Sequence, residues 1–208
     1  RDENNVSEYP IEASEDMKKY LAKELGGTPN NYKKIYIPDN MFIWATMNSA
    51  DQGVFPMDTA FKRRWEFSYL GIDEKEEGIE NRYIILGNGK FKRKVEWNKL
   101  RKAINNKLGS FKVNEDKLLG PYFLSSKAII VNEKGEIDKA VFEPIFKGKV
   151  LMYLFEDAAK QKRKSLFALD DDNIRYSSIC KEFDEKGVYV FHSDISKEFD
   201  KDIIEEEN

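Results

Sequence analysis

The chain has 208 residues, of which 40% are hydrophobic and 13% aromatic, which excludes wholesale disorder and suits one domain or two small ones. The formal net charge is −3 although 35% of the residues are charged, so any attraction to nucleic acid must come from local basic patches. The single cysteine, Cys180, excludes an internal disulfide and fits a reducing compartment. No apolar run approaches membrane-spanning length and no signal peptide is recognisable, so we expect a cytoplasmic protein.

The first predicted helix runs from Ser14 to Leu25. Ser14 is suited to the N-cap position, and the two acidic residues that follow it are favoured in a first turn. The apolar residues recur with helical spacing and form a single face, and Gly26 and Gly27 end the pattern. The members of this face are Met17, Tyr20, Leu21 and Leu25.

The most informative stretch lies between residues 38 and 67. Phe42–Thr46 is apolar on both faces, which predicts a central parallel strand, and Asn48 and Asp51 follow it. A short helix, Met57–Lys62, then ends in the pair Arg63 and Arg64 and leads to a second predicted strand, Trp65–Leu70. An amide at the end of a buried strand can position a water molecule or a phosphate oxygen, and arginines at a helix end can reach a neighbour's phosphates. Together these residues describe half of a nucleotide-hydrolysing site.

This stretch resembles the sensor-1 to arginine-finger region of the AAA+ ATPases. It is most similar to the McrB family, the NTP-driven motor subunits of methylation-dependent restriction systems, which read roughly P-x-N-hydrophobics-G-T-M-N-T-A-D-R-S and then D-x-A-hydrophobic-R-R-R-F-x-F. Three positions depart from that pattern: Ala45 replaces a glycine, Gln52 a basic residue and Lys62 a third arginine. The matching residues are Pro38, Asn40, Thr46, Met47, Asn48, Ala50, Asp51, Asp58, Ala60, Arg63, Arg64 and Phe67.

A weaker resemblance continues downstream. Leu119–Leu124 looks like the Gly-x-x-Tyr-Phe element of the family's lid domain. The helix predicted from Pro144 to about Ala159 looks like the family's lid helix, with Tyr153–Asp157 in place of its Tyr-Phe-acidic-acidic end. The resemblance covers about residues 35–190, most closely over 36–67.

The resemblance implies a role for each polar residue, and each role has a simpler alternative. Asn48 would be sensor 1, which positions the attacking water or the γ-phosphate, or it could simply cap a turn. Asp51 would orient Asn48 or a neighbouring arginine, or it could form an Asx turn. Arg63 or Arg64 would be an arginine finger that acts on the next subunit's nucleotide, with Arg63 favoured, or the pair could form a surface salt bridge to Asp58 or Glu66.

Two elements of an AAA+ site are absent from the sequence. No G-x-x-x-x-G-K-[ST] occurs, and no apolar run ending in paired acidic residues precedes Asn48 to hold Mg²⁺. We therefore expect the chain to be the C-terminal part of a longer protein and to be unable to hydrolyse nucleotide by itself. The alternative is a degenerate relative that never binds nucleotide.

The expected fold is α/β: the C-terminal part of an AAA+ P-loop NTPase core over residues 1–70, then a mainly helical lid domain with small β-hairpins over 71–208. The resemblance implies ATP or GTP with Mg²⁺ as the cofactors of the full-length protein. It also implies that copies of the full-length protein assemble into a ring, a hexamer, and that a nuclease subunit of the McrC type and DNA are its partners. A non-enzymatic DNA-binding or subunit-docking module on a degenerate AAA+ scaffold is the competing function.

The second half of the chain alternates short strands and helices. Tyr83–Leu86 and Lys90–Lys94 flank an Asn-Gly turn and predict a hairpin, and a helix with Trp97, Leu100, Ile104 and Leu108 on one face should end at Gly109. A second hairpin or loop is predicted around Asn132–Gly135. Pro144 is expected at the first position of the longest helix, Tyr176–Phe183 as a helix and Val188–Phe191 as a strand.

Other chemistry-bearing residues carry weaker signals. The basic clusters Lys90–Lys94 and Lys160–Lys164 could contact DNA phosphates, although solvated element edges explain them as well. His192 and Cys180 are isolated in the sequence, so we predict structural roles for them and no metal site. The acidic run Asp170–Asp172 carries no specific signal in a chain this charged.

Overall fold

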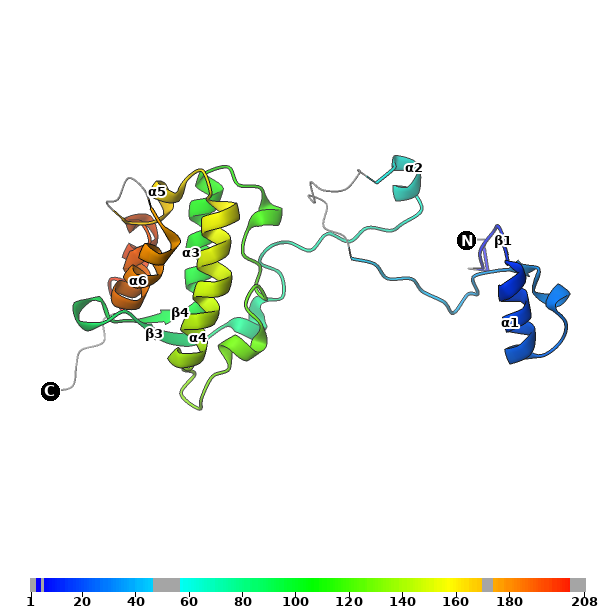
Figure 1. The fold of residues 1–208 in the computed structure, drawn as a ribbon, viewed down its shortest axis with the longest axis horizontal. Helices are drawn as coiled ribbons and strands as arrows, with labels where there is room; N and C mark the ends of the chain where they lie inside the picture. The colour runs from blue at the N-terminus through cyan, green and yellow to red at the C-terminus, as the bar shows by residue number, and fades with distance from the viewer. Residues whose placement is uncertain (1–2, 5, 47–56, 170–173, 203–208) are drawn as a thin grey trace. The chain divides into compact units, whose positions relative to one another are not determined.

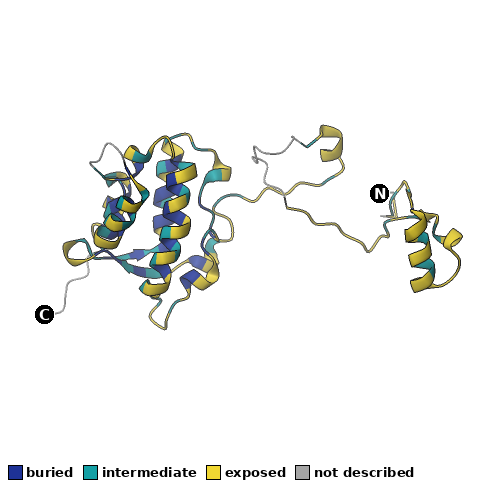
Figure 2. Ribbon diagram, in the orientation of Figure 1, coloured by how far each residue is buried: buried dark blue, intermediate teal, exposed yellow. Residues whose placement is uncertain are grey.

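The computed structural model of the chain describes residues 3–4, 6–46, 57–169 and 174–202 (Figure 1). The chain divides into two compact units, residues 1–48 and 49–208. The hydrophobic core of the second unit is one cluster of buried side chains between Ile79 and Phe199 (Figure 2). The domain boundary predicted at Gly71 and the AAA+ origin of the fold remain predictions.

The first unit contains the predicted helix. Helix α1 (Glu15–Leu25) begins at Ser14, whose hydroxyl accepts a hydrogen bond from the Met17 N–H at 3.3 Å, and Gly26 ends the helix with a φ of 83°. Strands β1 (Ile11–Glu12) and β2 (Lys34–Ile35) pair antiparallel beside it, and a 3₁₀ turn covers Pro29–Tyr32. No residue of α1 is buried, so the apolar face that the sequence predicts is formed but uncovered in this unit.

The two strands predicted on either side of the candidate site are not strands in the structure. Residues 41–46 and 66–70 have no strand assignment, and the side chain of Trp44 is 92% exposed. A central strand is stabilised by hydrogen-bonded neighbours on both edges and by apolar cover on both faces. Among the described residues, each sheet has only two strands, so neither segment finds such neighbours there.

The predicted hairpin is present with a longer turn. Strand β3 (Tyr83–Leu86) pairs antiparallel with β4 (Arg93–Glu96), and a 3₁₀ turn at Gly89–Phe91 replaces a two-residue Asn-Gly connection. At the start of this turn Gly87, at a φ of 77°, approaches the backbone of Gly187, and a Cβ on Gly187 would lie 2.6 Å from the Gly87 nitrogen. This close approach joins the hairpin to the end of helix α6 (Tyr176–Lys186).

Three helical segments meet in the core of the second unit, and each supplies one aromatic ring. Helix α3 (Trp97–Ser110) supplies Trp97, whose ring meets that of Phe146 edge-on at 6.0 Å, and Phe146 stacks at 4.9 Å on Phe183 of α6 (Tyr176–Lys186). All three rings are fully buried. Such aromatic contacts add to the free energy gained by burying their apolar surface. The predicted helices around Trp97 and Tyr176 are confirmed.

The longest helix begins earlier than predicted. Helix α4 (Lys139–Ile145) starts after Asp138, whose carboxylate accepts from the Ala140 N–H at 2.8 Å, so Pro144 lies inside the helix and not at its first position. Proline lacks the N–H that would bond to the Ala140 carbonyl. The helix continues through two π-helical segments, Phe146–Leu151 and Leu154–Ala158, and wider turns of this kind are typical of interrupted helices.

The remaining elements are short. Residues Gly187–Val190 form a 3₁₀ turn where a strand was predicted, and among the described residues Phe191 makes a single bridge, with Phe167. A bridge between Val131 and Ile137 confirms a narrow loop around Asn132–Gly135. None of the described helices is long and apolar enough to cross a membrane. The other helices and turns are α2 (Thr59–Lys62), α5 (Arg163–Leu166), α7 (Ser193–Ser196) and 3₁₀ turns at Glu76–Ile79, Glu115–Lys117, Ser126–Ile129 and Lys197–Phe199.

Candidate functional site

The predicted site residues fall on two parts of the chain. Asn48 and Asp51 lie outside the described residues, so their predicted sensor and orienting roles remain predictions. Arg63 and Arg64 lie at the C-terminal end of α2, where the short helix was predicted. Asp58 is the N-cap residue of α2, so the helix begins at Thr59, two positions after the predicted Met57.

The end of α2 presents Arg63 to solvent. Arg63 is the C-cap residue, its backbone N–H bonds to the Thr59 carbonyl at 3.2 Å, and the residue is exposed. A cation at this end is favoured by the partial negative charge of the helix C-terminus. The arrangement fixes the backbone of Arg63 and leaves its long side chain able to extend from the helix end.

Arg64 is held differently from Arg63. Its guanidinium Nη1 donates to the carbonyl of Ala60, one turn earlier in the helix, at 2.5 Å. This bond satisfies one of the carbonyls that a helix end leaves without a partner. The two arginines are therefore not equivalent: Arg64 bonds to its own helix through its side chain, whereas Arg63 bonds to it through its backbone N–H.

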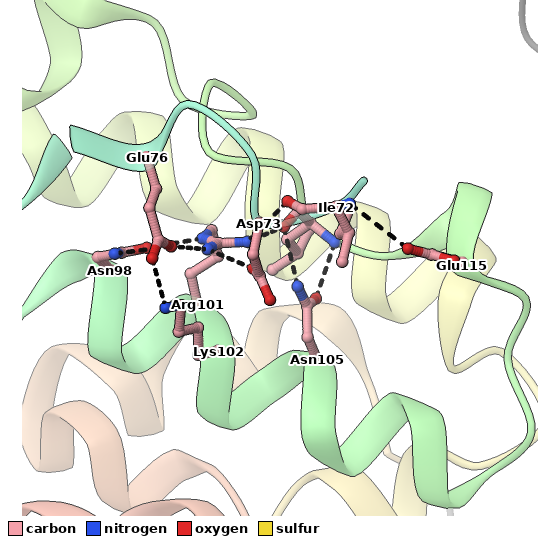
Figure 3. Close-up of polar contacts among 9 residues, drawn as sticks. Ile72, Asp73, Glu76, Asn98, Arg101, Lys102, Asn105 and Glu115 are labelled. Atoms are coloured by element: carbon pink, nitrogen blue, oxygen red, sulfur yellow. Dashed lines mark hydrogen bonds and ion pairs between the residues drawn. The ribbon is translucent and has the colours of Figure 1, made fainter. Parts of the chain in front are cut away.

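A cluster of ion pairs around the buried Arg101, which the sequence did not predict, holds residues 72–76 against helix α3 (Figure 3). Arg101 is fully buried on α3, and its Nη2 lies 2.7 Å from the Asp73 carboxylate and 3.0 Å from that of Glu76. Its other donors bond to Asn98 Oδ1 at 2.9 Å and to the Leu119 carbonyl at 2.9 Å. Nη1 also lies 3.5 Å from the Ile72 carbonyl, so each nitrogen of the guanidinium has an acceptor.

Two asparagines of α3 extend this cluster. The Asn105 amide donates to the Leu119 carbonyl at 2.9 Å and accepts from the Leu119 N–H at 2.8 Å, as a peptide group of a neighbouring strand would. Asn98 donates to Glu76 Oε2 at 3.1 Å. The signal in the sequence was the spacing of Asn98, Arg101 and Asn105, which places three polar residues on one buried face of the helix.

The cluster ties three segments of the chain together. It joins residues 72–76 and the loop at Leu119 to α3, and Lys102 adds a contact to Glu76 at 2.6 Å (Figure 3). Because the Arg101 guanidinium is fully buried and bonded to side chains and carbonyls of all three segments, the cluster has the properties of a structural clamp. Residues 72–76, which the cluster holds against α3, follow the predicted site segment, residues 38–67, by only a few positions in the chain.

The clamp makes the stability of the protein depend on pH. The hydrogen bond from Lys102, with Asn98 and the Arg101 charge, lowers the pKa of Glu76 below its ordinary value of 4.5. A carboxyl whose folded-state pKa is lowered contributes stability above its unfolded-state pKa, and that stability is lost as the pH falls through the folded-state pKa. We expect Glu76→Gln to lower the free energy of unfolding at pH 7 by about 1–2 kcal/mol and to reduce its loss below pH 4.5.

Urea unfolding of the wild type and of Glu76→Gln between pH 7 and pH 3 measures this dependence. Glu77→Gln is the matched control, because Glu77 is the neighbouring carboxylate and is exposed. Parallel pH profiles for the wild type and for Glu76→Gln would contradict the assignment.

The basic clusters are partly used inside the fold. Arg93 is buried, donates to the carbonyls of Lys90 and Lys92 at 2.9 Å each, and lies over the Tyr189 ring. Arg163 donates to the Phe155 carbonyl at 2.8 Å and lies 3.7 Å from that ring's centroid. These contacts favour the structural interpretation of both clusters over a DNA-binding one.

Cys180 and His192 lie in separate surroundings. Cys180 is partly buried on α6 beside Tyr176, whose hydroxyl donates to the Lys147 carbonyl at 2.8 Å and whose pKa is raised mainly by burial. His192 Nδ1 lies 3.5 Å from Asp194, and the hydrogen bond from Lys107 lowers the pKa of that carboxylate. Asp170–Asp172 lie outside the described residues, and among the rest no three His, Cys, Asp or Glu side chains could hold a metal together.

Comparison with known proteins gives one informative relationship. No protein-family model matches the chain, and no solved structure matches it. A curated relative is the type II restriction enzyme BsuMI component YdiS of Bacillus subtilis strain 168, which is 41% identical over 162 residues. The match covers 77% of this chain and 42% of the relative, so the chain spans less than half the length of that protein. The chain is therefore related to a component of a restriction system.

Proposed function

We propose that the chain is part of an AAA+ NTP-hydrolysing motor subunit of a DNA restriction system. The observation that carries the proposal is the relationship to a restriction enzyme component. It agrees with the resemblance of residues 38–67 to the McrB family, whose members are also restriction-system subunits. The relative and the motif both indicate a restriction system. The motor activity is inferred from the motif, because the relative's name does not state one.

In this proposal each part of the motif has a separate task. Asn48 positions the water that attacks the γ-phosphate of its own subunit's nucleotide, with Asp51 orienting it. Arg63 extends from the end of α2 to the nucleotide of the next subunit in a ring. The bond from Arg64 to Ala60 supports a capping role for Arg64. The nucleotide, ATP or GTP, would be bound between subunits, with DNA and a McrC-type nuclease subunit as partners.

The described residues do not supply a site for Mg²⁺ or for the triphosphate. No group of three or more metal-ligating side chains comes together among them, and the sequence has no P-loop. The tasks assigned to this chain are therefore to position water and to stabilise charge, and nucleotide binding is assigned to other parts of the full-length protein.

Hydrolysis assays on the full-length protein and on this chain test the proposal. We expect the full-length protein to hydrolyse ATP or GTP, the isolated chain to show no turnover, and Asn48→Ala to reduce the full-length rate by about tenfold to a hundredfold. Asn40→Ala, in the same motif but before the predicted strand, is the matched control and should retain most of the rate. Turnover by the isolated chain that Asn48→Ala abolishes would defeat the proposal, as would a full-length protein without any NTPase activity.

A further inference from the structure

The outer edge of β3 is paired at one end only. Tyr83 donates to the Gly135 carbonyl at 2.9 Å and accepts from the Ile137 N–H at 2.7 Å, which forms a short parallel ladder. A parallel strand that continued from Ile137 would reach Ile85 next. It does not continue, because Asp138 caps α4 and the chain turns into that helix.

Ile85 is left with an open backbone edge. It lies opposite Lys94 of β4, but the Lys94 N–H donates to the Asp202 carbonyl at 3.1 Å, away from β3. Ile85 and Lys94 are thus a non-hydrogen-bonded pair of the antiparallel ladder. Each residue of such a pair turns its own N–H and C=O away from the partner strand, toward the outer edge. Across the described ranges, no hydrogen bond of this N–H or carbonyl is present. An edge of this kind is a template for another strand.

An apolar groove lies beside this open edge. It has a volume of about 790 Å³ and is lined by Ile85, Ile130, Val131, Ile137 and Val141. Ile130 and Val141 are 63% and 43% exposed, although they are large apolar residues. An open strand edge next to apolar side chains provides the two elements of strand-addition recognition: backbone hydrogen bonds for affinity and pockets for alternate side chains.

The charges around the groove favour an acidic occupant. Its two carboxylates are engaged, since Glu136 lies 3.4 Å from Lys94 and Asp138 caps α4. Lys92 and Lys127 also line the groove, and the structure gives neither an ion pair among the described residues. Complementary charge of this kind selects partners and their register more than it adds affinity.

We propose that this groove binds an extended, acidic segment of a partner protein, which adds a strand to β3 at Ile85. Alternate apolar side chains of the segment enter the groove, and its acidic side chains meet Lys92 and Lys127. A nucleic acid would also be attracted to the two lysines, but it would use neither the open Ile85 backbone nor the apolar lining. The proposal does not depend on the motor activity proposed above.

A synthetic peptide of sequence Glu-Val-Glu-Val-Thr-Val-Glu with blocked ends is the probe, measured by calorimetry against the 208-residue chain. We expect a Kd below about 1 mM and protection of the Ile85 N–H from hydrogen exchange. Ile85→Pro removes the outward donor at a position where an edge strand tolerates proline, and it should weaken binding about fivefold, whereas Ile85→Val should not. Val141→Glu, at an exposed position, should weaken binding through charge repulsion if the proline variant does not fold.

A charge exchange identifies the class of partner. The double variant Lys92→Glu with Lys127→Glu should no longer bind the acidic peptide. It should instead bind the basic peptide Lys-Val-Lys-Val-Thr-Val-Lys. The proposal is overturned if neither peptide binds its matched chain, or if Ile85→Pro and Val141→Glu leave binding of the acidic peptide unchanged. Binding of duplex DNA that depends on the two lysines and is unaffected by Ile85→Pro, with no peptide binding, would assign the surface to nucleic acid instead.

Discussion

Replacing Arg63 by alanine in the full-length protein is expected to lower NTP turnover by about a thousandfold or more. A guanidinium that reaches a neighbour's γ-phosphate stabilises the charge that develops in the transition state, and such fingers are worth about 10³–10⁵ in rate where they have been measured. Arg63 is suited to this task because it is exposed at the C-cap of α2 with its backbone fixed by the Thr59 carbonyl. Steady-state turnover at saturating ATP or GTP measures the effect.

Two neighbouring cations provide matched controls. Lys62 is exposed on the same short helix, so Lys62→Ala removes one charge and should leave turnover within about threefold of the wild type. Arg64→Ala removes the bond to the Ala60 carbonyl, so it should loosen α2 and have a smaller effect on turnover than Arg63→Ala. A larger loss from Arg64→Ala would exchange the roles of the two arginines.

Mixed assemblies separate action on a neighbour from action within one subunit. In a ring, Arg63→Ala subunits lack the group that serves the next nucleotide, and Asn48→Ala subunits lack the group that serves their own. Some interfaces in a mixture of the two variants combine an intact Asn48 with an intact Arg63, so the mixture should be more active than either variant alone. No gain on mixing would rule out the neighbour-acting role of Arg63.

Local chemistry made much of the helical structure predictable. Ser14 and Gly26 bound α1 as the sequence predicts, because a hydroxyl N-cap and a left-handed glycine act within one turn of chain. The helix around Trp97 and the hairpin from Tyr83 likewise follow from apolar spacing and turn residues. The predicted start of α4 is wrong because proline is favourable at a first helical position, whereas the Asp138 side chain caps the helix six residues before Pro144.

Features that depend on distant partners could not be predicted in the same way. The Phe42–Thr46 sequence has the pattern of a buried strand, but a strand needs neighbours, and the described sheets supply none. The buried position of Arg101 depends on Asp73, 28 residues earlier, and on the Leu119 carbonyl, 18 residues later. A charged residue within an amphipathic helix is ordinarily exposed, so only its alignment with Asn98 and Asn105 marked it.

Replacing Arg101 by methionine is expected to lower the free energy of unfolding of the second unit by about 3 kcal/mol. Methionine fills similar space but leaves the Glu76 and Asp73 carboxylates without the guanidinium, and removing one partner of a buried pair typically costs about 3–5 kcal/mol. The lower figure applies because the Asp73 side chain is 51% exposed and Lys102 still contacts Glu76. Thermal unfolding followed by circular dichroism should show a Tm lower by about 6–12 °C.

Lys99→Met is the matched control on the same helix. Lys99 lies 3.6 Å from Asp202 and its side chain is 44% exposed, so its loss should change stability by less than about 1 kcal/mol. The double variant Arg101→Met with Glu76→Gln should be more stable than the sum of the single effects predicts, because the second change removes a carboxylate that the first leaves unpaired. Strict additivity, or an Arg101→Met variant as stable as Lys99→Met, would show that the contacts of Figure 3 do not hold residues 72–76 to α3.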